Sequence, residues 1–485
     1  MKLVSKVLLG LNMALIMAAC ADSSRVSLPP DSVIIEKQEK ASVHPTDRYY
    51  LGQVQLEVGN ENQLSNVMAD MKVKKGIDLS LINQIPGQPI YLMEINSLEP
   101  VDSVVKALKS DRRVVAAARN HMVSVDSMAI NDPLAPTQWG LQNIAQEAPH
   151  GLAGKSGADI GMDGVTAQGS YEVVVGVIDT GVDYYHEDLA ITETIDGKKV
   201  ILPGSNIWTN PGLVPGSGVA TNVISDAVNG QSYVGDLHGY NFVSRTPDPM
   251  DDMGHGTHVS GIIGALRNNY KGIAGINQKV SLMGLKFLGA DGSGSDFNAQ
   301  LAIYYTIGLK NKFPDKKFIL TNSWGSASRS TKNGDEDDFL LRAFARASKA
   351  DILSVAAAGN DGTSNRYAPH YPANFSSKIP NFITVGATDN MDQLASFSSY
   401  GFDQVNIAAP GVLIMSTVPE ALFGVGYQAW SGTSMATPFV TGAAALVWSE
   451  NLTMTASQVK ERLLSTVDVL PQLHGAITTS GRLNV

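Results

Sequence analysis

The sequence predicts an α/β protein, a doubly wound parallel sheet preceded by a small α+β unit. A continuous apolar run at 173–179, VVVGVID, ends in a carboxylate and is typical of a parallel strand buried on both faces. Further strand-then-loop patterns alternate with helical patterns along the chain, as in doubly wound folds. Near Asn131 the composition shifts to loops rich in Gly, Asp and Asn, and this shift separates the two units.

Composition bounds the size and the broad class of the protein. The chain has 485 residues, 44% hydrophobic and 17% charged, which is enough for a large core and for two or three domains. The net charge of −10 argues against nucleic acid as a partner and suits a soluble exported protein. The 46 glycines and 22 prolines indicate a loop-rich protein and not a disordered one.

The N-terminus has the pattern of an export signal. Lys2 and Lys6 precede an apolar run over 7–17, which is too short to span a bilayer but fits the core of a signal peptide. We therefore expect residues 1–20 to be a signal peptide. We find no later segment that is long and apolar enough to cross a membrane.

Cys20 is the single cysteine, so the chain has no intramolecular disulfide framework. The small residues before it resemble the lipobox of bacterial lipoproteins, which implies a lipid on Cys20 and a membrane-anchored precursor. Met17 stands where leucine is usual, so cleavage by the general signal peptidase remains an alternative. Residues 21–47 are polar and without periodicity, and we interpret them as a tether.

Residues 48–126 form the small unit. The elements expected in it are a strand over 49–58, a helix over 60–73, a strand over 89–95, a helix over 101–118 and an extended piece over 118–126. This order is compatible with a small α+β sandwich.

The second unit, 131–485, repeats a strand-then-loop design. Strand patterns lie at 173–179, 281–288, 317–325, 351–360 and 382–388, and helical patterns at 258–266, 299–309, 338–348 and 432–448. Sites in open α/β sheets assemble at the carboxyl ends of the strands. The long irregular section 190–239 is predicted to be a surface insertion.

The stretch 432–448, GTSMATPFVTGAAALVW, passes from small and hydroxyl residues directly into a helical pattern. Pro438 falls about one turn in, where a missing N–H costs little. Ser434 lies at the start of this helix, where backbone N–H groups point outward and partial positive charge collects. That environment favours an oxyanion beside the hydroxyl and suits a nucleophile, although a plain helix cap is the commoner role of such a serine.

Four motifs contain the residues that we expect to carry the chemistry. They are VVVGVIDTGVDYYHEDL with Asp179, DDMGHGTHVSGIIGAL with His255, AAAGN with Asn360 and GTSMATP with Ser434. Together they resemble the subtilisin-like serine peptidases over residues 131–485, in the Asp–His–Ser order of that family. The resemblance implies a subtilisin-like fold and an exported serine endopeptidase with broad preference for extended polypeptides and without a catalytic cofactor.

The resemblance assigns a role to each of these residues. Ser434 would attack the scissile carbonyl, and His255 would take its proton and later pass it to the leaving amine. Asp179 would fix the imidazole tautomer and stabilise the imidazolium. The backbone N–H of Ser434 and the side-chain amide of Asn360 would stabilise the oxyanion.

Other polar residues near the motifs have plainer interpretations. His258 follows His255 on the same helix and is expected to be structural, and His186 and His238 lack a catalytic context. An Asn after Gly is most often a turn residue, and an Asp at a strand end is often a cap. The accompanying motifs favour the catalytic interpretation for Asn360 and Asp179.

Two further stretches resemble the substrate-binding edges of the family. LGADGSGS resembles the strand that pairs with an extended peptide, SWG resembles the opposite edge, and AAG would line the primary specificity pocket. Trp324 stands where a smaller apolar residue is common, and we expect an apolar or aromatic P1 residue. The implied substrate-binding residues are Gly292, Ser293, Gly294, Ser323, Trp324, Gly325, Ala357, Ala358 and Gly359.

A structural calcium ion is also implied, because RNNYKGIAG resembles the calcium loop of the family. The implied ligands are side-chain oxygens of Asp188 and Asn269 and the carbonyls of Arg267, Lys271 and Ile273, a mixed oxygen set of the kind that Ca²⁺ takes. A further segment near Asp132 or Gln138 is left open, and a metal-free polar loop is the alternative.

The position of the unit at 48–126 resembles that of the ferredoxin-like prodomain of the family, which assists folding and inhibits the active site. An unrelated N-terminal module is the alternative. The resulting prediction is a zymogen whose mature enzyme is periplasmic, cell-surface or secreted. A catalytically silent surface-binding protein and a narrow processing protease are the competing functions.

Overall fold

The computed structural model describes residues 49–97, 99–121, 130–148, 151, 153–212, 224–225, 232–327 and 338–485. The described residues fall into two compact units, one within 27–127 and the other within 128–485. The predicted signal peptide, tether and Cys20 lie outside the described residues.

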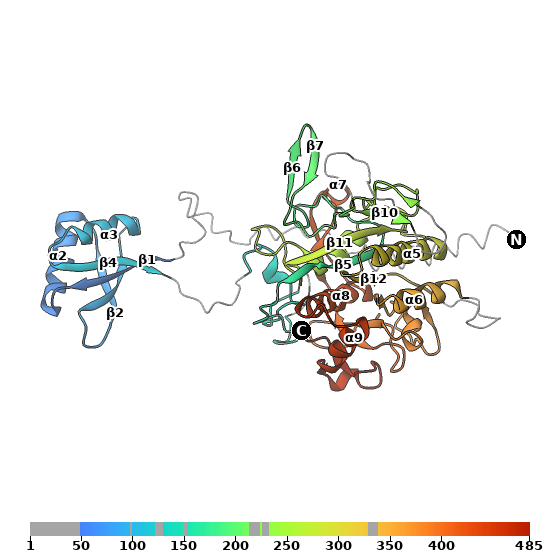
Figure 1. Cartoon of the computed structure of the whole chain (residues 1–485). Coiled ribbons are helices and arrows are strands. Elements are labelled where there is room, and N and C mark those ends of the chain that lie inside the picture. Colours follow the sequence, from blue (N-terminus) through green and yellow to red (C-terminus); the bar gives the residue numbers. More distant parts are fainter. Residues whose placement is uncertain are drawn as a thin grey trace. The chain divides into compact units, whose positions relative to one another are not determined.

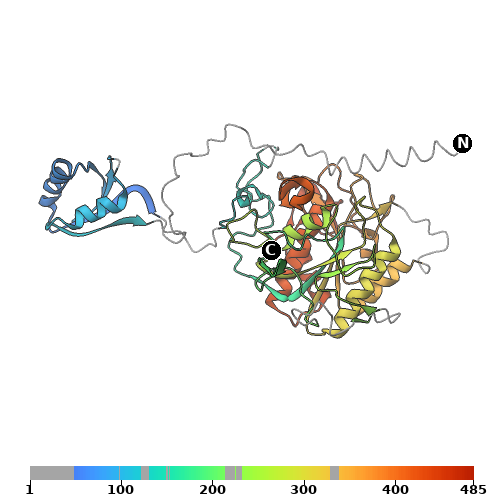
Figure 2. The same cartoon turned by 90° about the horizontal axis from the view of Figure 1, so that it is seen from above.

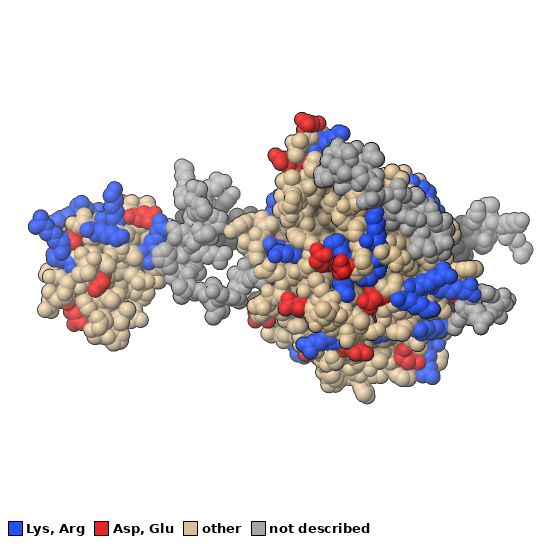
Figure 3. Space-filling view, in the orientation of Figure 1, with Lys and Arg blue, Asp and Glu red and all other residues tan. Residues whose placement is uncertain are grey.

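The small unit is an α+β unit, as the sequence predicts. Its described strands form a four-stranded sheet in the order β2-β3-β1-β4. Figure 3 shows Lys and Arg side chains gathered over α2 and α3, including lysines in the last turn of each helix, where they complement the helix dipole. The elements are β1 (Tyr49–Val58), η1 (Glu61–Gln63), α2 (Leu64–Lys75), β2 (Leu79–Gln84), β3 (Ile90–Ile95), α3 (Val101–Lys109) and β4 (Val114–His121).

Two expectations for this unit are wrong. The helix predicted over 101–118 ends at Lys109, and β4 begins at Val114. Asp111 accepts hydrogen bonds from both the backbone N–H and the guanidinium of Arg113, which fixes a turn between the two elements. Strand β2 was not anticipated, because buried and exposed residues do not alternate along it as they do in a typical half-buried strand.

The large unit contains the doubly wound sheet. Its described strands form a nine-stranded sheet in the order β10-β11-β5-β12-β14-β16-β17-β21-β20, parallel except for the β20–β21 pair. Thus the predicted fold class is confirmed. The strands are β5 (Gly169–Asp179), β10 (Gly239–Asn241), β11 (Lys279–Lys286), β12 (Lys317–Asn322), β14 (Leu353–Ala357), β16 (Phe382–Thr388), β17 (Ile407–Pro410), β20 (Asp468–Val469) and β21 (Gly481–Arg482).

Helices cover both faces of this sheet (Figures 1 and 2). Side chains of β5 alternate between two cores: Val173, Val175 and Val177 pack with α4, α8 and α9, whereas Val174 and Ile178 pack with α5 and α6. This alternation explains the continuous apolar run, since neither face of the strand meets water. The helices are α4 (His255–Gly264), α5 (Asp296–Lys312), α6 (Phe339–Lys349), α8 (Thr433–Glu450) and α9 (Ala456–Ser465).

Smaller elements lie around the sheet. Within the predicted insertion, β6 and β7 form a hairpin that projects from the large unit in Figure 1. The buried Trp208 and Tyr233 attach the same section to the core beneath α5. The remaining elements are η2 (Ala135–Thr137), β6 (Thr192–Ile195), β7 (Lys198–Ile201), β8 (Ile224–Ser225), β9 (Ser232–Tyr233), β13 (Ser326–Ala327), β15 (His370–Tyr371), η4 (Ala373–Ser377), β18 (Ile414–Thr417), α7 (Glu420–Phe423), β19 (Tyr427–Trp430) and η5 (Pro471–Leu473).

Candidate active site

Asp179 and His255 meet at the carboxyl edge of the sheet. Asp179 is the last residue of β5 and is buried, and His255 is the first residue of α4. His255 Nδ1 lies 2.8 Å from Asp179 Oδ1 and 3.0 Å from Oδ2. Burial disfavours the imidazolium, but the Asp179 carboxylate outweighs it, and the pKa of His255 is raised above its usual value. The geometry fixes the tautomer with the proton on Nδ1 and leaves Nε2 as the free base.

A second buried carboxylate, Asp251, positions this pair, and the sequence analysis missed it. Asp251 accepts hydrogen bonds from the N–H groups of Met253, Gly254 and Thr257 and from the Thr257 hydroxyl, at 2.6–3.0 Å. The Thr180 hydroxyl donates to Asp251 and accepts from the backbone N–H at position 256. Asp251 therefore joins the loop after Asp179 to the start of α4. Its place four residues before His255, within the same motif, is the signal that could have identified it.

Ser434 is the second residue of α8 and is 8% exposed. Pro438 has no N–H to donate to the Ser434 carbonyl four residues earlier, and the Ser323 hydroxyl donates to that carbonyl instead, at 2.9 Å. In return, the Ser434 hydroxyl donates to the Ser323 carbonyl at 3.0 Å. The proline thus frees an acceptor that attaches the nucleophile candidate to the end of β12.

The structure has no hydrogen bond between His255 and Ser434, both of which lie in its described part, because the serine hydroxyl points to Ser323. Catalytic hydrogen bonds are often long or absent before substrate binds and form only in the complex. The Ser434 hydroxyl must therefore leave the Ser323 carbonyl before it can donate to His255.

Asn360 has its amide orientation fixed. Its Oδ1 accepts from the backbone N–H of Thr433 at 2.9 Å and from the Thr433 hydroxyl at 2.8 Å, so Nδ2 faces the other way. A Cβ at Gly432 would lie 3.4 Å from Asn360 Nδ2 and 3.6 Å from the backbone nitrogen of Ser434. Two N–H donors thus border one space, and the glycine keeps this space open, which is the arrangement an oxyanion needs.

The predicted substrate edges lie at carboxyl ends of neighbouring strands. Gly292 to Gly294 belong to a tight turn after β11, in which Leu288 and Gly294 form an antiparallel bridge. Ser323 to Gly325 follow β12, and Ala357 to Gly359 end and follow β14. Trp324 packs against Phe287, with ring centroids 4.7 Å apart. The three predicted segments therefore lie on the same edge as Asp179.

Trp430 is an aromatic residue of the site that the sequence analysis did not single out. Its indole stacks on His258, with centroids 4.6 Å apart and planes at 3°, and also lies 6.3 Å from the His255 ring. Burial lowers the pKa of His258 to about 3, so this ring is neutral and its Nε2–H donates to the Gln428 carbonyl. Trp430 therefore borders the general-base candidate from the β19 side.

The predicted calcium loop wraps around Asp188, which is fully buried. Asp188 Oδ1 accepts from the Asn269 side-chain nitrogen at 2.7 Å, and Oδ2 accepts from the Ile273 backbone N–H at 2.9 Å. Burial raises the pKa of Asp188 to about 7. The side chain of Arg267 donates to the carbonyls at positions 275 and 276, and that of Lys271 pairs with Glu187 at the surface.

The donor set fits calcium in its chemistry, because a buried carboxylate, an amide oxygen and backbone carbonyls are the ligands of this ion. Asn269 turns its nitrogen and not its oxygen toward Asp188, so an ion there would require the amide to reverse. Of the open alternatives, Asp132 accepts from the backbone N–H groups of Asn268 and Asn269, and Gln138 pairs with Ala274. Within the described part of the chain, no three His, Cys, Asp or Glu residues form a metal cluster.

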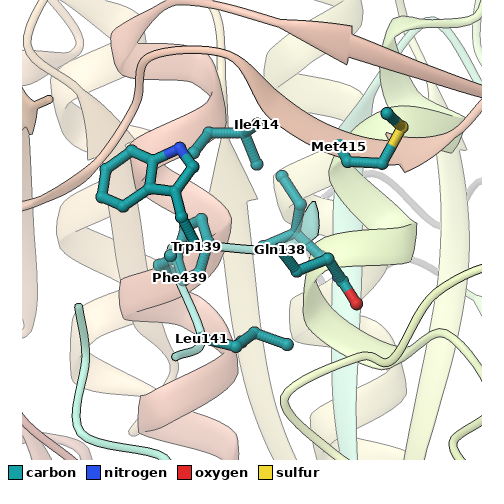
Figure 4. Close-up of a pocket in the computed structure, with 8 residues that line it drawn as sticks. Gln138, Trp139, Leu141, Ile414, Met415 and Phe439 are labelled. Atoms are coloured by element: carbon teal, nitrogen blue, oxygen red, sulfur yellow. The ribbon is translucent and has the colours of Figure 1, made fainter. Parts of the chain in front are cut away.

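A small pocket elsewhere in the large unit contains none of the predicted catalytic or substrate-binding residues (Figure 4). It is apolar apart from Gln138, whose amide oxygen and nitrogen both bond to the backbone of Ala274. We assign no chemistry to it. Its lining residues are Gln138, Trp139, Gly140, Leu141, Ile262, Ile414, Met415 and Phe439.

In the described residues, no helix has the length and apolar character needed to cross a membrane.

Three features of this site together define a class of enzyme. They are a serine at the start of a buried helix, a histidine paired with a buried carboxylate, and two N–H donors that border one space. On a doubly wound sheet, they are the parts of a serine peptidase.

Comparisons with known proteins name the family. The model of the subtilase family matches residues 170–481. A thermostable alkaline protease of Halalkalibacterium halodurans is 37% identical over 405 residues, which cover 83% of this chain and 85% of that protein. Subtilisin amylosacchariticus of Bacillus subtilis subsp. amylosacchariticus is 31% identical over 370 residues, covering 76% and 74%. A cold-adapted subtilisin-like serine proteinase of known structure is 26% identical, covers 71% of this chain and 97% of its own, and has a TM-score of 0.48.

The chain belongs to the subtilase family and is a serine endopeptidase that acts on polypeptide substrates.

Proposed function

We propose that Ser434, His255 and Asp179 are the nucleophile, general base and orienting carboxylate of this endopeptidase, and that Asn360 is an oxyanion donor. The observation that carries the proposal is the pairing of His255 Nδ1 with both oxygens of Asp179 at 2.8 and 3.0 Å. The space bordered by Asn360 Nδ2 and the Ser434 backbone nitrogen supports it independently.

The reaction follows from this geometry. His255 Nε2 accepts the Ser434 proton while the serine oxygen bonds to the scissile carbonyl carbon, and the developing oxyanion accepts from the two N–H donors. His255 then gives the proton to the leaving amine, which yields an acyl-enzyme. Water attacks this ester by the same proton path and releases the acid and the free serine. Backbone pairing along 292–294 and 323–325 would hold an extended substrate with broad sequence preference.

Labelling with a fluorophosphonate probe, followed by mapping of the modified residue, tests the proposal. We expect modification at Ser434 in the wild type and none in Ser434→Ala. Ser449→Ala is a matched control on the same helix and should label like the wild type. Labelling at another serine, or none in folded wild-type enzyme, would contradict the assignment. Labelling also separates this function from a catalytically silent binding protein, which would not react, whereas a narrow processing protease would still label.

We also propose that the unit at 48–126 is an inhibitory prodomain and the chain a zymogen. Its four-stranded sheet with two helices supports this. The alkaline protease of Halalkalibacterium halodurans supports it too, because its match covers 83% of this chain and so must extend beyond residues 131–485. The test is to add the separately produced unit to mature enzyme, with slow-binding inhibition as the expected result. No inhibition at micromolar concentration would indicate an unrelated module.

Export and anchoring are proposed from the sequence alone, since Cys20 lies outside the described residues. A lipid on Cys20 would remain with the prodomain after cleavage between Val125 and Asn131, so that activation would also release the enzyme from the membrane. Fractionation of cells expressing wild type and Ser434→Ala tests this, with N-terminal sequencing of the active form. A mature N-terminus before Tyr49, or equal release of the variant, would refute it.

We further propose that the loop around Asp188 binds a structural calcium ion. When bound, calcium supplies charge compensation for the buried carboxylate, while Asn269 and the carbonyls of Arg267, Lys271 and Ile273 contribute the other oxygens. Because the ion would bind only the folded state, excess EGTA should lower the melting temperature more than it slows turnover. Asp188→Asn should lose most of the response to EGTA, and an unchanged melting temperature of the wild type in EGTA would exclude the site.

A further inference from the structure

Between the predicted substrate-binding edge at 323–325 and the predicted pocket segment at 357–359 lies a histidine that neither motif contains. A Cβ added at Gly325 would come within 2.0 Å of His370 Nε2, and one added at Gly359 within 3.1 Å of His370 Nδ1. The imidazole thus occupies space that the two glycines leave open, one glycine on each wall. His370 is held there by β15, which pairs with β13 through Ala327, and by its backbone N–H, which donates to Asn374.

The ring nitrogens of His370 lack the partners that other histidines have. Nδ1 is buried without a hydrogen bond, and neither ring nitrogen has a partner among the described residues. Every other histidine whose side chain is described has at least one ring nitrogen hydrogen-bonded: His186, His238, His255, His258 and His474. His258 Nδ1 is also buried without a partner, but its Nε2 is hydrogen-bonded, so His370 differs in having neither ring nitrogen paired within the described residues.

A second polar atom without a partner lies at the same place. Ser399 is 1% exposed, and its hydroxyl, also without a hydrogen bond, lies 3.1 Å from the position of a Cβ at Gly359. That is the distance of His370 Nδ1 from the same point. The interior beside Gly359 is therefore polar and incompletely hydrogen-bonded.

We propose that His370 forms the floor of the primary specificity pocket and selects P1 side chains of medium length that end in a carbonyl oxygen, glutamine and glutamate, over aromatic ones. This inference rests on the proposed function, because it takes the segments at 323–325 and 357–359 as the pocket walls. It replaces the expectation of an apolar or aromatic P1 residue, which did not take His370 into account. The ring shortens the pocket, and its Nε2 supplies a hydrogen bond that a carbonyl oxygen or an amide can complete.

The charge of His370 decides between the two favoured side chains. Burial lowers the pKa of His370, and the carboxylate of Asp361, the charged group whose field acts on the ring, opposes this effect. A neutral ring can exchange one hydrogen bond with a glutamine amide through Nε2, because an amide carries both a donor and an acceptor. Below its pKa, the ring carries a positive charge, and a charge-assisted hydrogen bond from its Nε2–H favours a glutamate carboxylate.

Hydrolysis of peptide substrates that differ only at P1 tests the inference, with kcat/KM measured for glutamine, glutamate, leucine and phenylalanine. Two variants separate the two roles of the ring. His370→Gly reopens the space, so we expect the phenylalanine-to-glutamine ratio to rise about tenfold to a hundredfold. His370→Leu fills the space without hydrogen bonds, so it should still reject phenylalanine but lose the preference for glutamine over leucine by about tenfold.

The pH dependence adds a readout that packing alone would not change. The ratio of glutamate to glutamine cleavage in one enzyme cancels the titration of His255. Since burial lowers the pKa of His370, the ratio should be constant above pH 6.5 and increase only at lower pH in the wild type, and it should lack this rise in His370→Leu. His238→Gln is the matched control, because His238 is a buried histidine outside the pocket that bonds to the Trp208 carbonyl. Its ratios should equal those of the wild type.

Failure of this inference can be told from failure of the proposed function. An enzyme that labels with fluorophosphonate but prefers phenylalanine over glutamine by more than tenfold would overturn the role of His370 and leave the catalytic assignment intact. The same holds if His370→Leu keeps the wild-type ratios. Should His370→Gly not fold, the wild-type P1 profile and His370→Leu decide the question by themselves.

Discussion

The proposed catalytic centre and the proposed primary pocket lie on one edge of the same sheet, yet they differ in how their polar groups are paired. Around the centre, Asp179 accepts from His255 and from the Thr180 backbone N–H, and Asp251 accepts from five donors. In the pocket, His370 Nδ1, Ser399 Oγ and the indole nitrogen of Trp324 are buried without a partner.

This difference distinguishes positioning from recognition. Polar groups that are fully paired inside the protein hold one geometry, which suits groups that must be in place before each reaction cycle. Polar groups that are buried and unpaired gain their hydrogen bonds only when a ligand arrives, which makes them sensitive to what the ligand carries. The centre is therefore expected to govern kcat, and the pocket to govern the choice of substrate.

The largest effect expected is from Ser434→Ala. It should reduce kcat about 10⁶-fold, the size known for subtilisin itself, because the nucleophile is lost. The melting temperature should change little, since α8 keeps a small residue there. The P1 preference of inhibitory peptides should survive, which would separate the centre from the pocket, and unprocessed precursor should accumulate if maturation is autocatalytic. Hydrolysis at the wild-type rate by Ser434→Ala would contradict the assignment of Ser434 as the nucleophile.

A smaller loss is expected from Asn360→Ala, about 10²–10³-fold in kcat, a magnitude also known from subtilisin, with KM nearly unchanged. The contrasting variant is Asn365→Ala. Asn365 Nδ2 donates to the Ala358 carbonyl and so supports the pocket wall. Its loss should change P1 ratios more than kcat. Steady-state kinetics with the P1 series measures both, and identical kinetic patterns for the two asparagines would remove the distinction between the regions.

The pH dependence of hydrolysis also distinguishes the proposed catalytic centre from the proposed pocket. Only neutral His255 can accept the serine proton, and Asp179 raises its pKa above 6.5. For a substrate with leucine at P1, kcat/KM should therefore be maximal at pH 8–9 and fall about tenfold per pH unit once pH is below that pKa. The sign is the opposite of that expected for glutamate relative to glutamine at P1. An apparent pKa well below 6.5 for the leucine substrate would show that burial outweighs the Asp179 charge.

Much of this arrangement could be predicted because it is local in sequence. The run at 173–179 reports a strand buried on both faces, and the motifs around Asp179, His255, Asn360 and Ser434 each end a strand or begin a helix. The parallel sheet then brings these ends to one edge. The helix predicted over 101–118 was wrong because the Asp111–Arg113 turn and pairing of β4 with β1 override the local helical pattern.

Other residues could not be predicted, because their roles arise from contacts between distant segments. His370 follows Gly359 by eleven positions in a loop without a motif, and only the β13–β15 pairing brings it between the walls. The exchange between Ser323 and Ser434 depends on a proline that removes one N–H. Likewise, no sequence pattern indicates that Asn269 turns its nitrogen toward Asp188.

Lys286 connects the proposed catalytic centre to the proposed pocket. Of the replacements considered, its replacement should have the smallest effect on kinetics. It is the last residue of β11 and is 3% exposed. Its ammonium donates to the Thr180 carbonyl at 2.7 Å and to the Leu288 carbonyl at 2.8 Å, and it pairs with Asp252. One cation thus links the loop after the orienting carboxylate, the turn before the peptide-pairing segment and the loop that leads to α4.

Lys286→Met keeps the length of the side chain but leaves two carbonyls without their donor, so we expect a loss of about 2–3 kcal/mol in the free energy of unfolding. The effect on kcat/KM should be only severalfold, because Asp251 still holds α4, and it should appear in both kcat and KM. Lys286→Arg should not restore stability, because a planar guanidinium cannot replace a compact ammonium among three acceptors. Lys279→Met, an exposed lysine on the same strand, is the control for thermal unfolding and kinetics. A Lys286→Met enzyme as stable as the control would mean that the two regions are positioned independently of each other.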